Sequence, residues 1–297
     1  MQILQLMSKE LSLDPDYILK LSIDNMAYKK YRIPKKNGKG KREIYHPSKS
    51  LKLLQYWLVR RIFNKFPISK YSKAYSKGNS IKKNALIHRD SNYILHMDIT
   101  KFFESITPYH VDKLLDKIED ISKDDKELIK RIILYNGEYL VVGSVASPVV
   151  SNCIMYNIDL DIFEKCIKGT KLNYTRYADD IVISSKSFID KEIIDKISDI
   201  LKYNKFDINR SKTYFMNKSK KRTVTGIVID NNSNRLSLGS KKYKEIKSMI
   251  YNLLIKGNGD KGKILGYLSY IRDIDEDKYN SIRSIYIKYD KNNTLFY

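Results

Sequence analysis

Residues 172–185 of the chain read LNYTRYADDIVISS, and this stretch decides the fold. Two apolar runs, rich in aromatic and β-branched residues, flank the adjoining carboxylates of Asp179 and Asp180, which predicts two buried strands that meet at an acidic turn. A pair of acids at a hairpin tip is ordinarily a solvated turn, and that alternative stays open. If the strands are buried, each carboxylate raises the pKa of the other unless a cation neutralises them. A divalent metal with oxygen ligands meets that need.

A third carboxylate, Asp98, ends another short strand pattern, YILHMD, at residues 93–98. If the two acidic strands are neighbours, Asp98 and Asp179 face one another, and carboxylates from different strands can bridge two Mg²⁺ ions. One ion would activate a primer hydroxyl, and the other would hold a triphosphate and the leaving pyrophosphate. Because Mg²⁺ uses only a few carboxylates together with substrate phosphates, three acids suffice.

The surrounding segments predict an α+β fold, in which strands and helices alternate in the middle of the chain and helical units flank them. Residues 1–30 are expected to form amphipathic helices broken at Ser12–Pro15, and residues 31–47 a β-hairpin with a basic tip. Further helices are predicted over 49–66, from Pro108, over 124–135, from Pro148 to about 165, over 187–203 and from Ser240 onward. Further strands are predicted at 139–148, where a turn follows, and at 213–216 and 222–229. Asp159 and Asp161 are interpreted as the polar face of a helix.

The composition favours a polyanionic partner. The chain of 297 residues carries 56 Lys and Arg against 34 Asp and Glu, a net charge of +22. Basic surfaces bind nucleic acid because counterions are released from the phosphates. A coding bias toward lysine is the alternative, but it does not explain why Asp and Glu are so much fewer than Lys and Arg. The two cysteines, Cys153 and Cys166, lack metal-ligand spacing and indicate a reduced, cytoplasmic protein, and neither a signal peptide nor a membrane span is predicted.

The acidic segments resemble the catalytic motifs of reverse transcriptases. Met97–Phe103, MDITKFF, is similar to the first motif and Tyr177–Asp180, YADD, to the second, while Ser147–Asn152, SPVVSN, lies between them in the family's order. The resemblance covers about residues 25–290. It implies an RNA-directed DNA polymerase with a right-hand fold of fingers, palm and thumb. The implied catalytic acids are Asp98, Asp179 and Asp180, which hold two Mg²⁺ ions together with the backbone carbonyl of Ile99.

The same resemblance implies how the nucleotide is held. Phe103 matches the residue that stacks under the incoming sugar and excludes a 2′-hydroxyl, although Phe102 or Phe103 is expected in the core. Lys212 matches a lysine that could act as general acid toward pyrophosphate, and a surface phosphate contact is its alternative. In the basic hairpin, Arg42 best matches the arginine that closes over the triphosphate and Lys36 matches less closely. A solvated face is the alternative for these cations.

One position departs from the family pattern. Where the family has Pro-Gln-Gly, this chain has Val141–Val142–Gly143, so the contact of the glutamine side chain is missing or supplied elsewhere. Gly143 still allows the backbone to approach the nucleotide closely. Fidelity and nucleotide affinity, rather than the reaction, are the properties that this departure affects.

Two short motifs resemble signatures of bacterial retron reverse transcriptases. Residues 84–88, NALIH, are similar to Asn-Ala-x-x-His, and residues 224–226, VTG, are similar to Val-Thr-Gly. A helix with a buried histidine is the alternative for the first motif, and a solvated helix face is the alternative for the lysines of the thumb. The residues implied to hold RNA stems by shape and phosphate contacts are Asn84, His88, Val224, Thr225, Gly226, Lys241, Lys242, Lys244 and Lys247.

The retron resemblance also implies a specific biology. Such an enzyme binds a structured non-coding RNA encoded beside it, primes from the 2′-hydroxyl of an internal guanosine, and uses dNTPs to copy part of the RNA into branched msDNA. Host RNase H would trim the template, and an effector protein encoded nearby would complete an anti-phage defence system. The alternatives are a group II intron or diversity-generating reverse transcriptase without accessory domains, and an RNA-binding scaffold that keeps polymerase motifs.

The predicted boundaries divide the chain into three units. Residues 1–92 are expected to form the N-terminal helices and the fingers, and residues 93–230 the palm, with a fingers insertion around 108–140. Residues 231–297 are expected to form the thumb.

Overall fold

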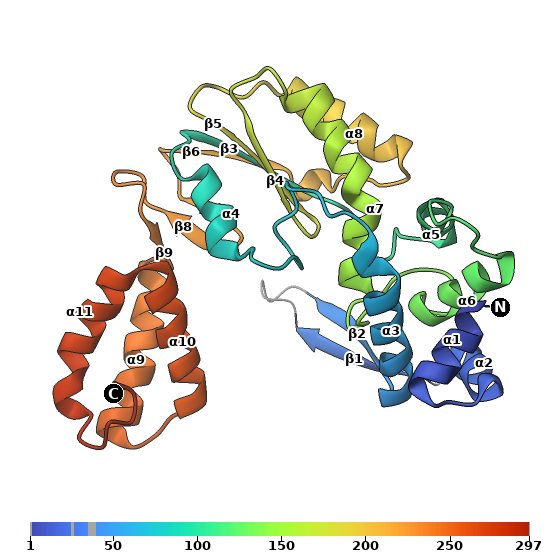
Figure 1. Ribbon diagram of the computed structural model, residues 1–297. Coiled ribbons are helices and arrows are strands. Elements are labelled where there is room, and N and C mark those ends of the chain that lie inside the picture. Colours follow the sequence, from blue (N-terminus) through green and yellow to red (C-terminus); the bar gives the residue numbers. More distant parts are fainter. Residues whose placement is uncertain (1, 25–26, 35–39, 297) are drawn as a thin grey trace.

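A four-stranded antiparallel sheet occupies the centre of the structure (Figure 1), which is a computed structural model that describes residues 2–24, 27–34 and 40–296. Its strands follow the order β4-β5-β3-β6. They are β3 (Tyr93–Asp98), β4 (Asn173–Tyr177), β5 (Asp180–Ser185) and β6 (Tyr214–Asn217). The two acidic strand patterns therefore lie side by side, as predicted.

Side chains that alternate along the strands bury both faces of this sheet. On one face, Leu95 and Ile183 belong to a large core that includes residues of α7 (Ser147–Ile162) and α8 (Glu192–Tyr203). On the other face, Ile94 and Val182 join a second core with α4 (Ile81–His88) and the C-terminal elements. Helix α4 lies over only part of this second face (Figure 1).

The N-terminal helices and the β1–β2 hairpin lie at one end of the molecule (Figure 1). Helix α6 contacts the four other helices named at this end, α1, α2, α3 and α5. Strands β1 and β2 pair antiparallel, and the tip of their hairpin, residues 35–39, lies outside the described residues. The elements are α1 (Gln2–Leu11), α2 (Pro15–Ile23), β1 (Tyr28–Pro34), β2 (Lys41–Pro47), α3 (Lys49–Arg61), α5 (Pro108–Leu115) and α6 (Lys123–Ile133).

Three C-terminal helices lie at the opposite end (Figure 1). A small antiparallel sheet, β7-β8-β9, connects them to the central sheet and packs on α4. Gly257 ends α9 in the left-handed conformation, which glycine adopts without steric cost. The elements are β7 (Arg222–Val224), β8 (Ile227–Ile229), β9 (Leu236–Ser237), α9 (Ser240–Lys256), α10 (Lys261–Ile274) and α11 (Glu276–Tyr286).

The α+β class is confirmed, but three local predictions are wrong. The strand expected within 139–148 is only an isolated bridge between Tyr135 and Tyr139, and the residues that follow form a loop. The strand expected over 222–229 is a hairpin, because Thr225 and Gly226 both have positive φ and form a two-residue turn. Helix α8 begins at Glu192 rather than at 187.

Within the described part of the chain, none of the helices combines the length and the apolar character that crossing a bilayer requires.

Candidate active site

The three predicted acids come together at one end of the central sheet. Asp98 is the register partner of Asp180 across β3 and β5, and Tyr177 pairs with Asp180 at the start of the hairpin. Ala178 has a φ of 57°, which lets the chain reverse over two residues and places Asp179 in the turn. The N–H of Ile99 donates a hydrogen bond of 3.0 Å to the carbonyl oxygen of Asp179, so the backbone after β3 is tied to this turn.

The electrostatics of this end show a shortage of positive charge. Burial, with the negative charges of Asp179 and Asp98 adding to it, raises the pKa of Asp180 to about 6. Burial also raises the pKa of Asp179, with Asp98 adding to the effect, while Lys212 and Arg42 oppose it. A bound cation would reverse these shifts, because it favours the ionised form of each carboxylate.

Lys212 forms an ion pair with Asp98 in this structure. Its Nζ is 2.7 Å from Oδ1 and 2.9 Å from Oδ2 of that carboxylate. The short helical turn Arg210–Lys212 is held beside β3 because the N–H of Asn209 donates to the carbonyl oxygen of Asp98 at 2.7 Å. The lysine side chain is 59% exposed, so it can leave the carboxylate for another anion without unfolding a core.

Metal binding by the three carboxylates stays a prediction. In the described ranges, no group of three or more His, Cys, Asp or Glu side chains is arranged to hold a metal ion. Both oxygens of Asp98 accept hydrogen bonds from Lys212. The donor chemistry nevertheless fits a hard divalent cation, since three carboxylates and the backbone oxygen of Ile99 are the kind of ligands that Mg²⁺ prefers.

The two phenylalanines after β3 differ in burial, and the prediction that one of them lies in the core is met by Phe102. Phe102 is buried, and its ring centroid lies 6.1 Å from that of Phe206. Phe103 is half-buried, and its ring stacks at 6.5 Å with Tyr75, a residue that the sequence did not single out. Burial and the nearby charge of Asp179 raise the pKa of Tyr75, so this ring also belongs to the acidic end.

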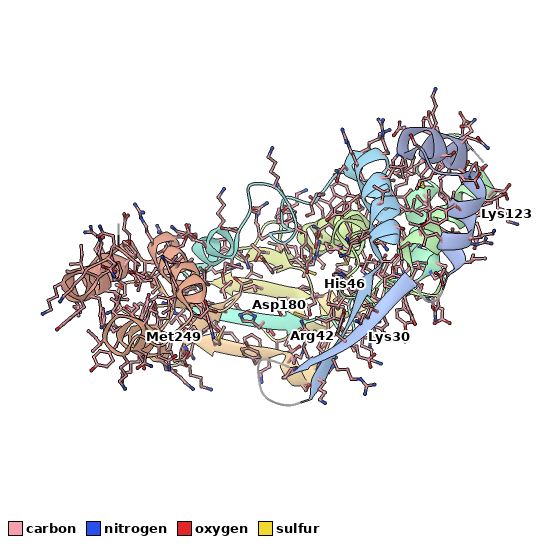
Figure 2. The ribbon with its side chains drawn as sticks, turned by 90° about the horizontal axis from the view of Figure 1, so that it is seen from below. Lys30, Arg42, His46, Lys123, Asp180 and Met249 are labelled. Atoms are coloured by element: carbon pink, nitrogen blue, oxygen red, sulfur yellow. The ribbon has the colours of Figure 1, made fainter. Side chains whose placement is uncertain are left out.

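The β1–β2 hairpin brings one predicted cation near the acids. Figure 2 shows Arg42 on the hairpin, which extends toward the sheet that carries Asp180. Arg42 is exposed, and its charge lowers the pKa of Asp179. Lys36, the second predicted cation, lies outside the described residues.

Gly143 has a contact within the protein that explains its residue type. Its φ is +107°, and a Cβ there would lie 2.5 Å from the carbonyl oxygen of Tyr45 on β2. The N–H of Tyr45 also donates to the carbonyl oxygen of Val142 at 2.8 Å. The absence of a Cβ at Gly143 therefore lets the backbone approach the hairpin closely, and its contact with the nucleotide stays a prediction.

The prediction that Asn84 and His88 contact RNA is wrong, because both side chains are buried. His88 lies between two hydroxyls, with Nδ1 2.7 Å from Ser184 Oγ and Nε2 2.8 Å from Thr175 Oγ1. Burial lowers the pKa of His88 to about 3, so the ring is neutral. Both amide atoms of Asn84 lack a hydrogen-bond partner among the described residues. The alternative, a helix with a buried histidine, is correct.

The second signature is a turn that docks on the first. Val224 is fully buried, which excludes it as an RNA contact, whereas Gly226 is exposed. The hydroxyl of Thr225 donates to the carbonyl oxygen of Ile81, at the start of α4, over 3.4 Å. The two signature segments are therefore parts of one packing unit between the central sheet and the C-terminal helices.

The predicted lysines of α9 have different surroundings. Lys241 and Lys244 are exposed, and Lys247 is half-buried. The Nζ of Lys242 lies 3.1 Å from Glu245 and 4.3 Å from the centroid of the Tyr267 ring, so this lysine is already engaged within the protein.

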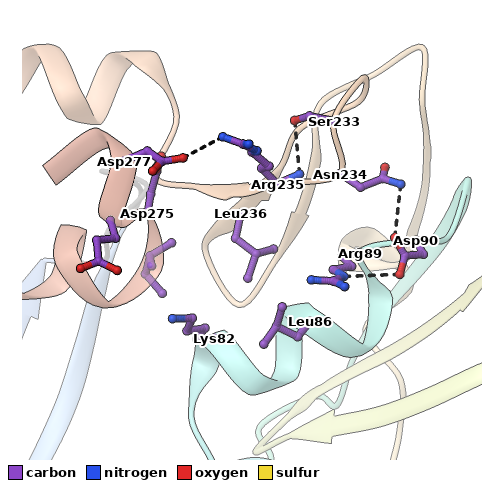
Figure 3. A pocket seen from close by; sticks show the side chains of 12 residues that line it. Lys82, Leu86, Arg89, Asp90, Ser233, Asn234, Arg235, Leu236, Asp275 and Asp277 are labelled. Atoms are coloured by element: carbon purple, nitrogen blue, oxygen red, sulfur yellow. Dashed lines mark hydrogen bonds and ion pairs between the residues drawn. The ribbon is translucent and has the colours of Figure 1, made fainter. Parts of the chain in front are cut away.

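A pocket of about 450 Å³ lies where α4 meets the β8–β9 loop and α11 (Figure 3). None of the three predicted acids lines it. Its charged side chains pair with one another or with near neighbours: Arg235 with Asp277 at 2.8 Å, Arg89 with Asp90 at 3.4 Å, and Lys82 with Asp273 at 3.5 Å. The acidic end of the sheet, and not this pocket, is the candidate active site.

Asp159 was assigned to a polar helix face, and this interpretation is wrong. Its side chain is 0% exposed and pairs with Arg176, also 0% exposed, at 2.8 Å. The signal in the sequence was Arg176 itself, a charged residue inside an otherwise apolar strand two positions before the turn. Such a charge is buried only when it is paired, so an acid elsewhere in the chain had to face it.

Comparisons with known proteins agree with this geometry. Residues 33–229 match the protein family described as reverse transcriptase (RNA-dependent DNA polymerase). The chain is 34% identical over 278 residues to the Retron Ec73 reverse transcriptase of Escherichia coli, covering 88% of this chain and 87% of that protein. It is 30% identical over 272 residues to the Retron Ec86 reverse transcriptase of Escherichia coli, covering 90% and 82%.

A solved structure resembles the fold. The apo telomerase from Candida tropicalis has a TM-score of 0.50 and 13% sequence identity over 89% of this chain and 58% of that chain. This chain therefore spans little more than half the length of the telomerase. At this identity the likeness concerns the fold alone, and it agrees with a right-hand polymerase fold.

Proposed function

Since this chain belongs to the reverse transcriptases, and within them to those of bacterial retrons, we propose that it copies a structured non-coding RNA into msDNA by two-metal nucleotidyl transfer. Membership in the family makes it an RNA-directed DNA polymerase. The observation that supports the two-metal chemistry is the acidic end of the sheet, where Asp98 and Asp180 are register partners and Asp179 occupies the turn. Burial and mutual repulsion raise the pKa of Asp180 to about 6, which is the condition that a cation relieves.

The residues at the acidic end of the sheet would have two roles, metal binding and proton donation. Asp98, Asp179, Asp180 and the carbonyl of Ile99 would hold two Mg²⁺ ions. The ions, when bound, activate the attacking hydroxyl and neutralise charge on the leaving pyrophosphate. Lys212 would leave Asp98 and give a proton to the pyrophosphate, because its exposed side chain can swing from one anion to the other.

The walls of the site would select the nucleotide. The half-exposed ring of Phe103 would lie under the incoming sugar and exclude a 2′-hydroxyl. Arg42, with Lys36 from the same hairpin, would close over the triphosphate, since phosphate oxygens bind guanidinium groups by charge-assisted hydrogen bonds. The exposed lysines Lys241 and Lys244, with Thr225 and Gly226, would contact RNA phosphates from the C-terminal unit.

The biological setting follows the retron relatives. The enzyme would prime from the 2′-hydroxyl of an internal guanosine of its RNA, in the bacterial cytoplasm, using dNTPs. Host RNase H would trim the template, and an effector protein encoded nearby would complete an anti-phage system. The unit boundaries of 1–92, 93–230 with its insertion at 108–140, and 231–297 would correspond to fingers, palm and thumb; the contacts of α6 with α1, α2 and α3 support the insertion.

The decisive experiment is DNA synthesis on the cognate RNA with Mg²⁺ and dNTPs. Asp179→Asn should reduce synthesis by at least ~10³-fold, the scale of losing about 4 kcal/mol of transition-state charge stabilisation, while RNA binding persists. Asp161→Asn is the matched control, because that carboxylate is 46% exposed on α7 and pairs with Lys165 at 3.7 Å. Full synthesis by Asp179→Asn would remove the metal assignment, and no synthesis by the wild type would favour an RNA-binding scaffold.

A second experiment tests the priming mode separately. Replacing each candidate guanosine of the RNA in turn by 2′-deoxyguanosine should abolish synthesis at one position only. Undiminished synthesis from every substituted RNA would reject 2′-hydroxyl priming and favour a group II intron or diversity-generating type, while leaving the polymerase assignment intact.

A further inference from the structure

A fully buried ion pair lies beside the catalytic turn. Arg176 on β4 and Asp159 on α7 are both 0% exposed. Nε and Nη2 of the arginine donate to the two carboxylate oxygens, each at 2.8 Å, and the hydroxyl of Tyr174 donates to the same carboxylate at 2.7 Å. Removing two charges from water costs free energy that their pairing only partly offsets, so stability is a weak reason for such a pair.

The guanidinium also reaches the turn that carries Asp179. Its Nη1 donates to the carbonyl oxygen of Ala178 at 3.1 Å. Ala178 has a φ of 57°, a conformation that non-glycine residues adopt only when the surroundings hold them there. The hydrogen bond from Arg176 is therefore one of the contacts that keep the catalytic turn in its shape.

Asn152 on α7 extends the network to a second segment. Its Oδ1 accepts from Nη1 and Nη2 of Arg176 at 3.4 and 3.3 Å, and from the hydroxyl of Ser72 at 2.8 Å. Its Nδ2 donates to the carbonyl oxygen of Ala74 at 2.9 Å. The amide is 0% exposed, and its oxygen and nitrogen both have partners, so its orientation is determined.

The backbone of Arg176 holds the same segment. Its N–H donates to the carbonyl oxygen of Tyr71 at 2.9 Å, and its carbonyl oxygen accepts from the N–H of Lys73 at 2.7 Å. Two residues further on, Tyr75 has a φ of 56° and places its ring 6.5 Å from that of Phe103. Arg176 is therefore hydrogen-bonded both to the turn that contains Asp179 and to the loop that contains Tyr75.

We propose that Arg176, oriented by Asp159 and Asn152, is a positioning residue that holds the Asp179 turn and the Tyr75 loop in one fixed arrangement, so that metal binding and nucleotide binding depend on the same buried network. The inference deepens the proposed function and rests on it. It requires an arginine, because a lysine could keep the charge pair with Asp159 but has a single donor group that cannot also reach Ala178 and Asn152 in plane.

The test compares Arg176→Lys with the wild-type full-length chain. Mn²⁺ binding is measured directly, from the free Mn²⁺ signal in electron paramagnetic resonance without nucleotide, and hydrogen exchange is followed in peptides covering 71–79 and 174–183. Affinity for Mn²⁺ should fall about 10–100-fold, the scale for outer-shell partners of metal ligands. Exchange should accelerate in both segments together. Wild-type Mn²⁺ affinity with a lowered Tm alone would show that the pair is only structural and overturn the proposal.

Arg222→Lys is the matched control. Arg222 is also fully buried. Its guanidinium donates to Asn231 and Asn234 and to the backbone oxygens of Asp230, Arg89 and Ser91, and none of these acceptors belongs to the Asp179 turn or the Tyr75 loop. This variant should lower the Tm without changing Mn²⁺ affinity or exchange in 174–183. A fall in Mn²⁺ affinity equal to that of Arg176→Lys would mean that any buried arginine has this effect, and would also overturn the proposal.

Ser72→Ala keeps the proposal testable if Arg176→Lys does not fold. It removes one hydroxyl from the network, and the KM for dNTP should rise about threefold with kcat nearly unchanged, the scale expected for the loss of one neutral hydrogen bond. An unchanged KM would reject the link to the Tyr75 loop. Failure of the proposed function would instead appear as a wild-type protein that neither binds Mn²⁺ nor synthesises DNA.

Discussion

Strand β5 carries the half-buried carboxyl of Asp180 and contacts the buried ring of His88 on the same face, and burial shifts their pKa values in opposite directions. Asp180 begins the strand, and Ser184, four residues later, is hydrogen-bonded to His88 of α4. Burial raises the pKa of Asp180 to about 6 and lowers that of His88 to about 3, so both groups are shifted toward their neutral forms. The difference lies in their partners. Each ring nitrogen of neutral His88 is hydrogen-bonded to a hydroxyl, whereas the carboxylate of Asp180 is repelled by the negative charges of two other carboxylates.

The comparison separates a completed packing site from a site that needs a ligand. The His88 end requires nothing from outside, because each polar atom of the ring already has a neutral partner. The Asp180 end keeps like charges close together, which is unfavourable in the folded protein until a cation binds. A motif that resembles a family signature can therefore serve packing, as NALIH does, or gather charges that need a ligand, as YADD does, and the burial and partners of its side chains distinguish the two.

The largest expected effect comes from removing the His88 ring from its packing site. His88→Ala should lower the free energy of unfolding by about 3 kcal/mol, because it leaves a cavity and two buried hydroxyls without their partner. RNA affinity of the folded protein should not change. Chemical denaturation and filter binding measure the two quantities. Ile87→Ala is the control, since that side chain is 38% exposed. Weakened RNA binding at unchanged stability would restore His88 as an RNA contact.

The next effect is in the pH dependence of the metal-free protein. The folded-state pKa of Asp180 is above its unfolded value of 3.8, so the folded state binds more protons and stability falls as pH rises from about 4 to 6. Asp180→Asn should remove this loss and stabilise the metal-free protein at neutral pH by on the order of 2 kcal/mol. Saturating Mg²⁺ should reduce the difference between the two proteins. An Asp180→Asn variant less stable than the wild type at pH 7.5 without metal would contradict the repulsion.

His88→Gln should change the same titration with the opposite sign. Because the folded-state pKa of His88 is below its unfolded value of 6.5, the unfolded state binds more protons, and its contribution to stability is lost as pH falls from about 6.5 to 3. As pH falls below 6, stability relative to the wild type should therefore decrease for Asp180→Asn and increase for His88→Gln. Parallel curves would mean that burial does not distinguish the two ends.

A smaller effect is expected from Phe103, at the acidic end of the central sheet. Phe103→Ala should raise the incorporation of ribonucleotides relative to deoxynucleotides by about 10-fold or more, the scale on which a pocket wall discriminates small groups. Single-nucleotide extension with each substrate gives the ratio of kcat/KM values. Phe102→Ala is the control, because its buried ring should affect stability and leave the ratio unchanged. Unchanged discrimination in Phe103→Ala would place that ring in the core as well.

The smallest effect concerns the exposed lysines. Lys241→Ala and Lys244→Ala should each reduce the slope of log K for RNA against log salt by about 1, as for the loss of one phosphate contact. Lys82→Ala is the matched control from α4, because Lys82 pairs with Asp273 at 3.5 Å. Equal slopes for all three variants and the wild type would show that phosphate contacts lie elsewhere on the protein.

The sequence by itself determined the acidic centre, the strands that carry it and the family. These features are local: apolar β-branched runs around Asp179 and Asp180, an acid that ends YILHMD, and caps and prolines that begin helices such as α5. Alternation along a strand also predicts which side chains share a face. Local patterns therefore located the helices around the sheet and the two strands that meet at Asp98.

Only the tertiary structure decided what surrounds each polar side chain. Lys212 and Asp98 are 114 residues apart, and His88 is 96 residues from Ser184. Asp159 and Arg176 belong to different elements, and the glycine at 143 is required by the backbone of Tyr45. Burial, charge pairing and steric contact depend on which distant segments the fold brings together, and the pattern of residues within one segment does not contain that information.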